Sequence, residues 1–353
     1  MAMTPRNLIR SSLRAINALG VDGTLSSDQH NDALELLNLM LDSWSIEELL
    51  PFDYVEHNVA LTANKTNYTI GESANAADRD GICVSQPVGS ATNLTINGVG
   101  SGSVTVSEGV ATMDVPRHVI LYSNGANTAV YMTVTGTNTH GDSVSEIIYM
   151  GASTVTTYGR KAFKTVTQVA SSAATSGNAE VGADDIINTR RPIMIVSAFV
   201  RNASFDDYPC YPATRERYNT WTDKDATTTV ATEITSLYYD RTYPTGEIFL
   251  YKIPSASGMT LYFDMWQPFK TITSATIDTD INLPQAYMLP MRWNLAAELA
   301  PEYGKDAELN KTVIQRAMET KEAVKMVNTR LPKPTMLTTP VSTVMGQPGI
   351  NKS

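Results

Sequence analysis

The hydrophobic periodicity of the chain changes twice along its length, and this division constrains the fold more than any other feature. Up to about residue 57, and again from about residue 281, apolar residues recur every three or four positions, as in amphipathic helices. Between these ends Ser, Thr, Gly, Asn and Val dominate, and polar residues alternate with apolar ones as in half-buried strands. We therefore expect an α+β multidomain protein with helical ends and a strand-rich middle.

Two helices are predicted near the start of the chain. Thr4 followed by Pro5 is a good helix start, because it joins a capping hydroxyl to a proline at the first helical position. Ser26 or Ser27 caps the second helix, which we expect to end before Pro51. The apolar stripes are Leu8, Ile9, Leu13 and Ile16 in the first helix and Leu34, Leu37, Leu41 and Trp44 in the second. Two short helices cannot bury both stripes alone, so they need a helical partner.

That partner is expected at the other end of the chain. The segment from residue 282 carries apolar residues at helical spacing, and Pro290 inside it predicts either a kink or the true helix start. Residues 300–304 predict a turn, and a long helix follows over roughly 306–329. Two helices from each end can close one small helical bundle, so that the strand-rich middle is an insertion between the halves of the bundle.

The first β region predicts a β-sandwich over residues 82–182. It contains short alternating segments that are separated by turn residues, such as Asn124-Gly125 and those at 140–142. Short strands at close intervals with turn signals between them are typical of a β-sandwich.

A second β region follows the sandwich. Residues 192–200 are apolar on both faces, as in a strand that is buried on both sides. Residues 247–253 and 259–266 predict a hairpin around a short loop. The early segment 67–70 also fits this region, which would make the sandwich an insertion inside an insertion.

These patterns divide the chain into six segments. The two halves of the helical bundle are 1–57 and 281–330, the two parts of the β domain are 58–81 and 185–280, the sandwich insertion is 82–184, and an extended C-terminal tail is 331–353. The tail has no acidic residue, contains four prolines and shows no helix or hairpin pattern. Such a composition fits a tail that is ordered on a partner and a plain flexible terminus equally well.

Composition narrows the classes of partner. The 353 residues carry a formal net charge of −9 with no visible basic stripe, which argues against a protein that grips DNA phosphates. The acidity either aids solubility or keeps a DNA conduit from binding the DNA that it guides, and both interpretations stay open. There is no stretch of about 18 apolar residues that would span a membrane, and residues 1–13 do not form a signal peptide.

No pattern of catalytic or metal-binding residues stands out. The four histidines show no metal-ligand spacing, and His140 is expected in a turn. The glycine-rich segment 98–102 is not followed by the helix that a phosphate loop needs, which favours a hairpin turn. Cys83 and Cys210 lie far apart and suit a reducing compartment. We therefore expect no enzymatic activity, no bound metal and no cofactor.

Taken in order, several segments resemble the head-to-tail adaptor family of short-tailed phages, also called tail accessory factors. The strings that resemble its three helices are TPRNLIRSSLRAINALGV (4–21), LDSWSIEELLPF (41–52) and INLPQAYMLPMRWNLAAELAPEYG (281–304). The strings that are similar to its β insertion are LTANKTNYTIG (61–71), RRPIMIVSAFVRN (190–202) and LYYDRTYPTGEIFLYKIP (237–254). Separately, residues 116–142 and 161–169 resemble the Ig-like modules that are common in phage structural proteins, so the sandwich at 82–184 is expected to be Ig-like.

The resemblance implies a structural protein of the virion neck and tail that is assembled in the host cytoplasm. Adaptors of this family form twelve-fold rings on the portal protein after DNA packaging, and their helical bundle surrounds a channel through which DNA passes without sequence-specific binding. Further implied partners are neighbouring adaptor subunits, a tail nozzle or hub, and tail fibres or spikes. The resemblance also implies that the tail binds the portal, and the apolar and proline residues available for this are Leu331, Pro332, Pro334, Met336, Leu337, Val341, Val344, Met345 and Ile350.

Two groups of residues allow more than one interpretation. The carboxylates of Glu47, Glu48, Glu298 and Glu302 form either a solvated helix face or part of the acidic lining of the DNA channel. Dense aromatic residues in the second β region suggest a sugar-binding platform, although strand spacing favours core and cross-strand pairs. These residues are Tyr238, Tyr239, Tyr243, Phe249, Tyr251, Tyr262, Phe263 and Trp266. Separately, the alternative function for the whole chain is a receptor- or glycan-binding module that uses the Ig-like sandwich at 82–184.

Overall fold

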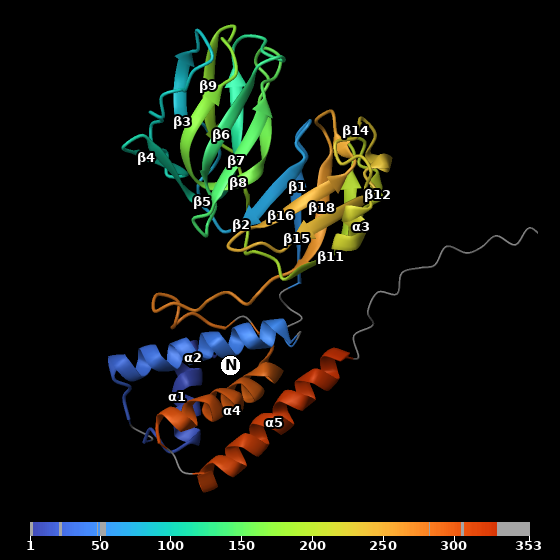
Figure 1. Ribbon diagram of the computed structural model, residues 1–353. Helices are drawn as coiled ribbons and strands as arrows, with labels where there is room; N and C mark the ends of the chain where they lie inside the picture. Colours follow the sequence, from blue (N-terminus) through green and yellow to red (C-terminus); the bar gives the residue numbers. More distant parts are fainter. Residues whose placement is uncertain are drawn as a thin grey trace, which may run out of the picture. The chain divides into compact units, whose positions relative to one another are not determined.

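The structure is a computed structural model that describes residues 3–20, 23–47, 49, 54–281, 283–304 and 307–329 (Figure 1). The fold is α+β and mostly β-sheet, as the periodicity of the sequence predicts. These residues contain five α-helices, of which the short helix at 215–219 is not expected from the sequence. The chain separates into two compact units. The helical unit comprises Met1–Leu49 and Ile272–Ser353, and the β unit comprises Leu50–Thr271.

The helical unit contains helices from each end of the chain. They are α1 (Pro5–Ala15), α2 (Ser27–Ile46), α4 (Gln285–Glu302) and α5 (Ala307–Thr329). Both predicted caps form: the Thr4 hydroxyl accepts the backbone N–H of Asn7, and Ser26 makes a reciprocal capping box with Gln29. Each cap satisfies backbone N–H groups that a helix start leaves without an intrahelical partner.

Helix α4 is the shared element of the helical unit, because it contacts α1, α2 and α5. Its buried side contributes Met291, Leu295 and Leu299 to the core. The N-terminal helices contribute Leu8, Ile9, Leu13, Leu37, Leu41 and Trp44. The Ser12 hydroxyl also donates to the Arg292 carbonyl over 3.0 Å, so a buried polar group on α1 is satisfied by α4.

Helix α4 starts before its first proline and ends after its second. It begins at Gln285, so Pro290 lies inside the helix and does not mark its start. The side-chain amide of Asn294 donates to the Pro290 carbonyl over 2.9 Å and to the Ala317 carbonyl of α5 over 3.2 Å. The helix continues through Glu302, so only the last part of the predicted turn at 300–304 is a turn, with Gly304 at a φ of 58°.

The first part of the β unit, called here the two-sheet body, consists of residues 54–71 and 187–266. Its sheets have the orders β1-β18-β11-β12 and β10-β2-β16-β15-β13, and β14 pairs with β17. The strands are β1 (Tyr54–Ala60), β2 (Asn67–Gly71), β10 (Ile187–Asn188), β11 (Met194–Arg201), β12 (Asp207–Pro209), β13 (Tyr211–Ala213), β14 (Thr227–Thr228), β15 (Ser236–Asp240), β16 (Gly246–Tyr251), β17 (Ile253–Pro254) and β18 (Thr260–Trp266), with helix α3 (Arg215–Asn219) and the short helix η2 (Ala231–Glu233) between strands. Both sheets contribute to one core, for example through Phe263 from one and Ile248 from the other.

Two sequence predictions for this body are wrong. The segments at 247–253 and 259–266 do not form a hairpin, because β16 and β18 belong to different sheets. Ile253 and Pro254 lie between them as the separate strand β17, which is buried and pairs with β14. The segment at 192–200 is not buried on both faces, because β11 buries Ile195 and Val200 while Ser197, next to a register shift, is exposed. Its apolar residues are partly covered rather than enclosed.

The second part of the β unit, the inserted module, consists of residues 78–183. Its seven strands form one sheet of order β3-β9-β5-β8-β6-β7, with β4 paired to β5. They are β3 (Asp78–Pro87), β4 (Val104–Ser107), β5 (Val110–Ser123), β6 (Tyr131–Thr137), β7 (Ser143–Tyr149), β8 (Thr157–Ser171) and β9 (Asn178–Ala183). Strands from across the sheet, including β3, β6 and β8, share one apolar core, so the sheet folds around its own buried side chains.

The inserted module leaves and rejoins the two-sheet body at neighbouring strands. The strand predicted at 67–70 is β2, and it pairs in parallel with β10, so that Ile70 lies opposite Ile187. One linker of about six residues follows β2, and a shorter one precedes β10. An insertion whose two ends lie side by side disturbs its host little, because the host strands keep their own pairing.

A fully buried arginine, Arg117 of β5, holds both linkers. Its guanidinium donates to the Asp184 carbonyl of the second linker over 2.8 Å and to the Asn75 carbonyl of the first over 2.8 Å. It also donates to both carboxylate oxygens of Asp114 and to the Ser73 hydroxyl. Burial raises the pKa of Asp114, but the Arg117 guanidinium and the other donors outweigh burial and hold this pKa well below its usual range.

A second buried polar group joins the inserted module to the two-sheet body. Nε2 of His118 lies 3.1 Å from Oε1 of Glu247 on β16, and the Asn67 amide donates to Oε2 of the same carboxylate over 3.0 Å. Nearby, the Lys65 ammonium pairs with the Asp184 carboxylate over 2.6 Å. Burial lowers the pKa of His118, but the Glu247 carboxylate outweighs burial and the net shift is upward. Burial raises the pKa of Glu247, and His118 and Asn67 reverse that shift.

The central position of α4 predicts a large effect of shortening a side chain in its core. Leu295→Ala is expected to lower the free energy of unfolding of the helical unit by about 2–5 kcal/mol, because Leu295 is fully buried and its loss leaves a cavity. Leu289→Ala on the same helix is the matched control, because Leu289 is exposed and its loss leaves none. Urea unfolding followed by circular dichroism at the helix wavelength measures both. Equal losses in the two variants would contradict this account of the core.

The His118–Glu247 pair predicts a pH-dependent contribution to stability. The raised pKa of His118 means that the pair is intact below the unfolded histidine pKa of about 6.5 and is lost as pH rises through the folded value. Glu247→Gln is therefore expected to cost about 3–5 kcal/mol near pH 6 and progressively less at alkaline pH. Glu233→Gln, which breaks the exposed pair with Lys252, should change stability little at any pH, because solvent screens that pair. Thermal unfolding between pH 6 and 9 checks this, and a Glu247→Gln cost that does not fall with pH would refute it.

Candidate assembly surfaces

One exposed face of α2 combines carboxylates with uncovered apolar side chains. Asp28, Asp32, Glu35, Leu39, Asp42 and Ile46 follow each other at intervals of four and three residues, which places them on one side of the helix. We call this set the acidic seam. Leu39 is 58% exposed and Ile46 is 73% exposed, whereas the opposite side of α2 is buried in the core. The helix contains no lysine or arginine, so nothing on α2 itself balances the four carboxylates.

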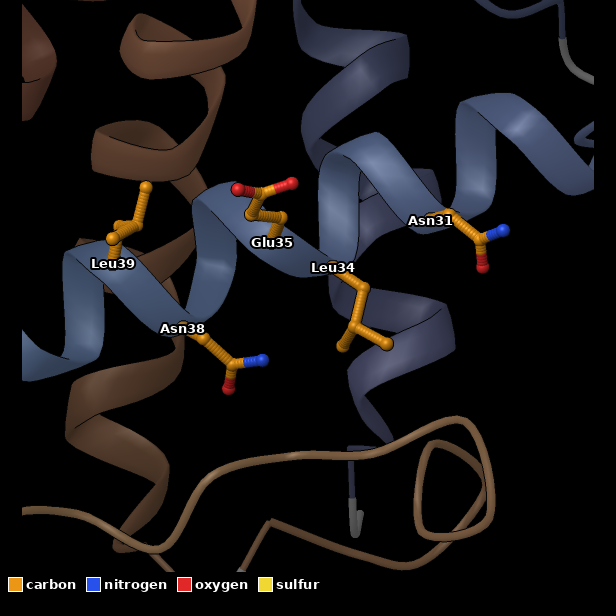
Figure 2. A pocket seen from close by; sticks show the side chains of 5 residues that line it. All are labelled: Asn31, Leu34, Glu35, Asn38 and Leu39. Atoms are coloured by element: carbon orange, nitrogen blue, oxygen red, sulfur yellow. The ribbon is translucent and has the colours of Figure 1, made fainter.

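A shallow hollow lies along the same helix. It is open, has a volume of about 290 Å³ and is lined by Asn31, Leu34, Glu35, Asn38 and Leu39 (Figure 2). The amide of Asn38 exchanges two hydrogen bonds of 2.9 Å with the backbone of Ile272, which fixes the segment after the β unit against α2. In Figure 2, Glu35 and Leu39 point to one side of the helix and Leu34 and Asn38 to another. A hollow lined by a single helix fits the side chains of a protein partner better than an enclosed small molecule.

Helix α5 carries a face of the same spacing and the opposite charge. Lys311, Ile314, Met318, Lys321 and Lys325 follow each other at intervals of three and four residues. We call this set the basic seam. Met318 is 64% exposed and Ile314 is 39% exposed, while Val313, Ala317 and Val324 face the core. A large exposed methionine beside lysines is a feature of protein contact surfaces.

The acidic residues predicted to line a channel are placed differently from one another. Glu47, at the end of α2, pairs with Lys321 over 2.6 Å and with Lys325 over 2.9 Å. Partial burial raises the pKa of Glu47, but the two ammonium groups outweigh burial and the net shift is downward. Glu298 and Glu302 lie exposed on α4, one turn apart, and Glu48 lies outside the described residues. Glu47 therefore ties α2 to α5 instead of joining the other carboxylates.

The portal-binding residues expected in the tail lie outside the described residues. These are Leu331, Pro332, Pro334, Met336, Leu337, Val341, Val344, Met345 and Ile350.

The cysteines, His140 and the glycine-rich segment show no arrangement typical of a catalytic or metal site among the described residues. Among the described residues, no group of three or more His, Cys, Asp or Glu could hold a metal ion. Burial raises the pKa of both Cys83 and Cys210 to about 12, which leaves these thiols protonated and unreactive. His140 lies in a turn that the Asn138 side chain organises, and residues 98–102 join β3 to β4 without a following helix. No described helix is long and apolar enough to cross a membrane.

The aromatic residues of the second β region belong mainly to the packing of the two-sheet body. Phe263 and Tyr239 lie in its core, and Tyr238 is paired in register with Phe249 across strands. Tyr218 of α3 stacks on Tyr238 with ring centroids 4.6 Å apart, which covers the outer face of that sheet. Most of these aromatic residues pack in the core, across neighbouring strands or beneath α3. Tyr243 is an exception, because it is 76% exposed.

Sequence reasoning missed the groups that hold the inserted module and those that form the two seams. Apart from Asp114, which lies three residues before Arg117, the partners of Arg117, His118 and Lys65 lie far away along the chain. The seams had a visible signal, because Leu39, Ile46 and Met318 are apolar residues on the polar side of a helical wheel. An apolar side chain on the polar side of a helix stays exposed in the folded chain, which indicates a contact with another molecule.

Comparisons with known proteins add little to this description. No protein-family model matches the chain, and no curated protein matches it. Among solved structures, the chain is similar to one from the structure of infectious bursal disease virus Gx strain, with 6% sequence identity and a TM-score of 0.11. The match covers 60% of this chain and 40% of that one. A TM-score this low carries no argument about fold or function.

Proposed function

We propose that this protein is a structural head-to-tail adaptor of a phage virion, which forms a ring under the portal and continues the DNA channel. The observation that carries the proposal is the pair of uncovered seams on two different helices, α2 and α5. A ring is a head-to-tail association that closes, and each subunit in it needs two different faces that fit each other. The sequence resemblance supplies the place of this ring in the virion.

In this proposal the helices from both chain ends form one bundle, which is the body of the ring. Contacts of α4 with α1, α2 and α5 support it, because they join the two ends of the chain. The exposed carboxylates of Glu298 and Glu302 are proposed to face the channel, where negative charge keeps DNA from adhering as it passes. The ring needs no sequence-specific contact with DNA and no catalytic group.

The C-terminal tail is proposed to bind the portal protein. The tail is rich in proline and has no acidic residue. Such a segment loses conformational entropy when it binds, yet it can cover a large area of its partner. Each tail contact can then be weak, because a ring of subunits binds many times at once. The β unit would face outward or downward, where a tail nozzle or hub and fibres or spikes are its partners.

A second candidate, a receptor- or glycan-binding module, is favoured by one feature of the inserted module. Tyr149 is 61% exposed at the end of the edge strand β7, and its ring lies 5.5 Å from that of Tyr131. Glu146, Tyr158 and Arg160 line the same open hollow of about 420 Å³. One exposed aromatic ring, such as that of Tyr149, beside a few polar side chains can bind a sugar.

One experiment with two deletions tests the adaptor proposal against this candidate. Deletion of residues 331–353 is expected to abolish docking to the cognate portal ring, because it removes the proposed portal contact. Deletion of residues 82–182 is expected to leave docking intact, because the inserted module is not part of that contact. Co-sedimentation with purified portal rings and negative-stain electron microscopy measure both. Normal docking after tail deletion would overturn the portal contact, and loss of host adsorption with normal particles after the second deletion would favour the glycan-binding candidate.

A further inference from the structure

We infer that neighbouring subunits contact each other through the acidic seam on α2 of one copy and the basic seam on α5 of the next. The inference rests on the proposed ring and names the surfaces that would close it. Both seams have side chains at alternating intervals of three and four residues. This spacing lets the side chains of one helix fit between those of another when the helices cross at a shallow angle.

The two seams are similar in length and opposite in charge. The acidic seam runs over 19 residues of α2, about 27 Å, and the basic seam over 15 residues of α5, about 21 Å. The first carries four carboxylates and no basic group, and the second carries three lysines. Complementary charge of this kind selects a partner and its register more than it adds affinity.

The seam residues leave two directions for the contact. On α2 the carboxylates at 28, 32 and 35 precede Leu39, and Asp42 lies between Leu39 and Ile46. On α5, Ile314 and Met318 lie between Lys311 on one side and Lys321 and Lys325 on the other. With Leu39 opposite Met318, an antiparallel arrangement places Asp32 opposite Lys325, and a parallel arrangement places Asp32 opposite Lys311 and Asp42 opposite Lys321. The charge exchange described below distinguishes the two directions.

The existing ion pairs of the basic seam are compatible with this contact. Lys321 and Lys325 both bind Glu47 of their own chain. Each ammonium group has three N–H donors, so a carboxylate of the neighbour can share it. Glu47 also holds the two lysine side chains in place before the neighbour arrives, which reduces the entropy lost on contact.

The contact is expected to be weak between free subunits. Two helix faces bury less surface than the roughly 1,000 Å² that a stable interface needs. Most of the affinity in a ring would therefore come from closure and from binding to a common template. Disulfide trapping suits such a contact, because it captures transient encounters irreversibly.

Trapping between two single-cysteine variants tests the pairing directly. The native thiols of Cys83 and Cys210 are buried and do not compete. Mixed full-length Leu39→Cys and Met318→Cys chains are expected to form a covalent heterodimer about tenfold faster than either variant forms a homodimer. A mixture of Leu39→Cys with Glu72→Cys, an exposed position in the β unit, is the control for random collision. Heterodimers no faster than this control would overturn the inference.

The double variant Leu39→Cys/Met318→Cys separates this inference from the proposed function. A ladder of covalent oligomers on oxidation supports the pairing of the seams. An internal disulfide that leaves the chain monomeric overturns it. Rings on the portal that carry no 39–318 link overturn this pairing while the adaptor proposal stands. Linked chains that stay open and never close into rings support the pairing and contradict the proposed ring.

A charge exchange tests the register. In the antiparallel arrangement, Asp32 lies opposite Lys325 when Leu39 lies opposite Met318, whereas in the parallel arrangement it lies opposite Lys311. Asp32→Lys in the Leu39→Cys chain is expected to slow trapping by about tenfold, and Lys325→Glu in the Met318→Cys chain is expected to restore the rate when both are mixed. Asp80→Lys, an exposed change of equal charge in the β unit, should leave the rate unchanged. Failure of Lys325→Glu to restore the rate, with both chains folded by circular dichroism, would exclude this register.

Discussion

The buried side of α4 is the interaction on which the helical unit depends. Neither the two helices before the β unit nor the two after it can bury their apolar stripes alone, because each pair leaves one side of each helix in water. Helix α4 contacts α1, α2 and α5, so the core closes only when the ends of the chain meet. Folding this unit therefore requires contacts more than 200 residues apart along the chain, such as that between Ser12 and Arg292. The β unit between the ends must fold without blocking that closure.

Buried hydrogen bonds and ion pairs hold the inserted module to the two-sheet body, because the module too depends on contacts between distant segments. A chain that leaves and returns through neighbouring strands exposes backbone groups in two linkers, and burial of those groups requires partners. Arg117 supplies donors to carbonyls of both linkers, and Asp114 neutralises its charge. Lys65 with Asp184, and His118 with Glu247, add two more pairs in which each buried charge faces an opposite one. Removal of one partner would leave the other charged and buried, which is why such links hold a module in a defined position.

The sequence was informative where local rules decide the structure. Thr4-Pro5 and Ser26 mark helix starts through their own side chains, and the strand β2 is visible as an isolated run of strand-forming residues. It failed where a distant segment decides the outcome. Residues 247–266 look like a hairpin, yet Ile253 and Pro254 pair with β14 and carry the chain into the other sheet. The roles of Arg117 and His118 gave no signal for the same reason, because, apart from Asp114, their partners at 73–75, 184 and 247 are not defined by spacing.

The charges on the two seams also determine which kinds of assembly are open to the chain. A purely apolar face can pair with a copy of itself around a two-fold axis, and such a dimer leaves no face for a third subunit. Two acidic seams brought together would place carboxylates against carboxylates, and two basic seams would place lysines against lysines. Only the pairing of unlike seams relieves this repulsion, and it is head-to-tail when each copy uses its two seams on two different neighbours. The same charges discourage apolar aggregation, since Leu39, Ile46 and Met318 are exposed and each is flanked by ionised side chains.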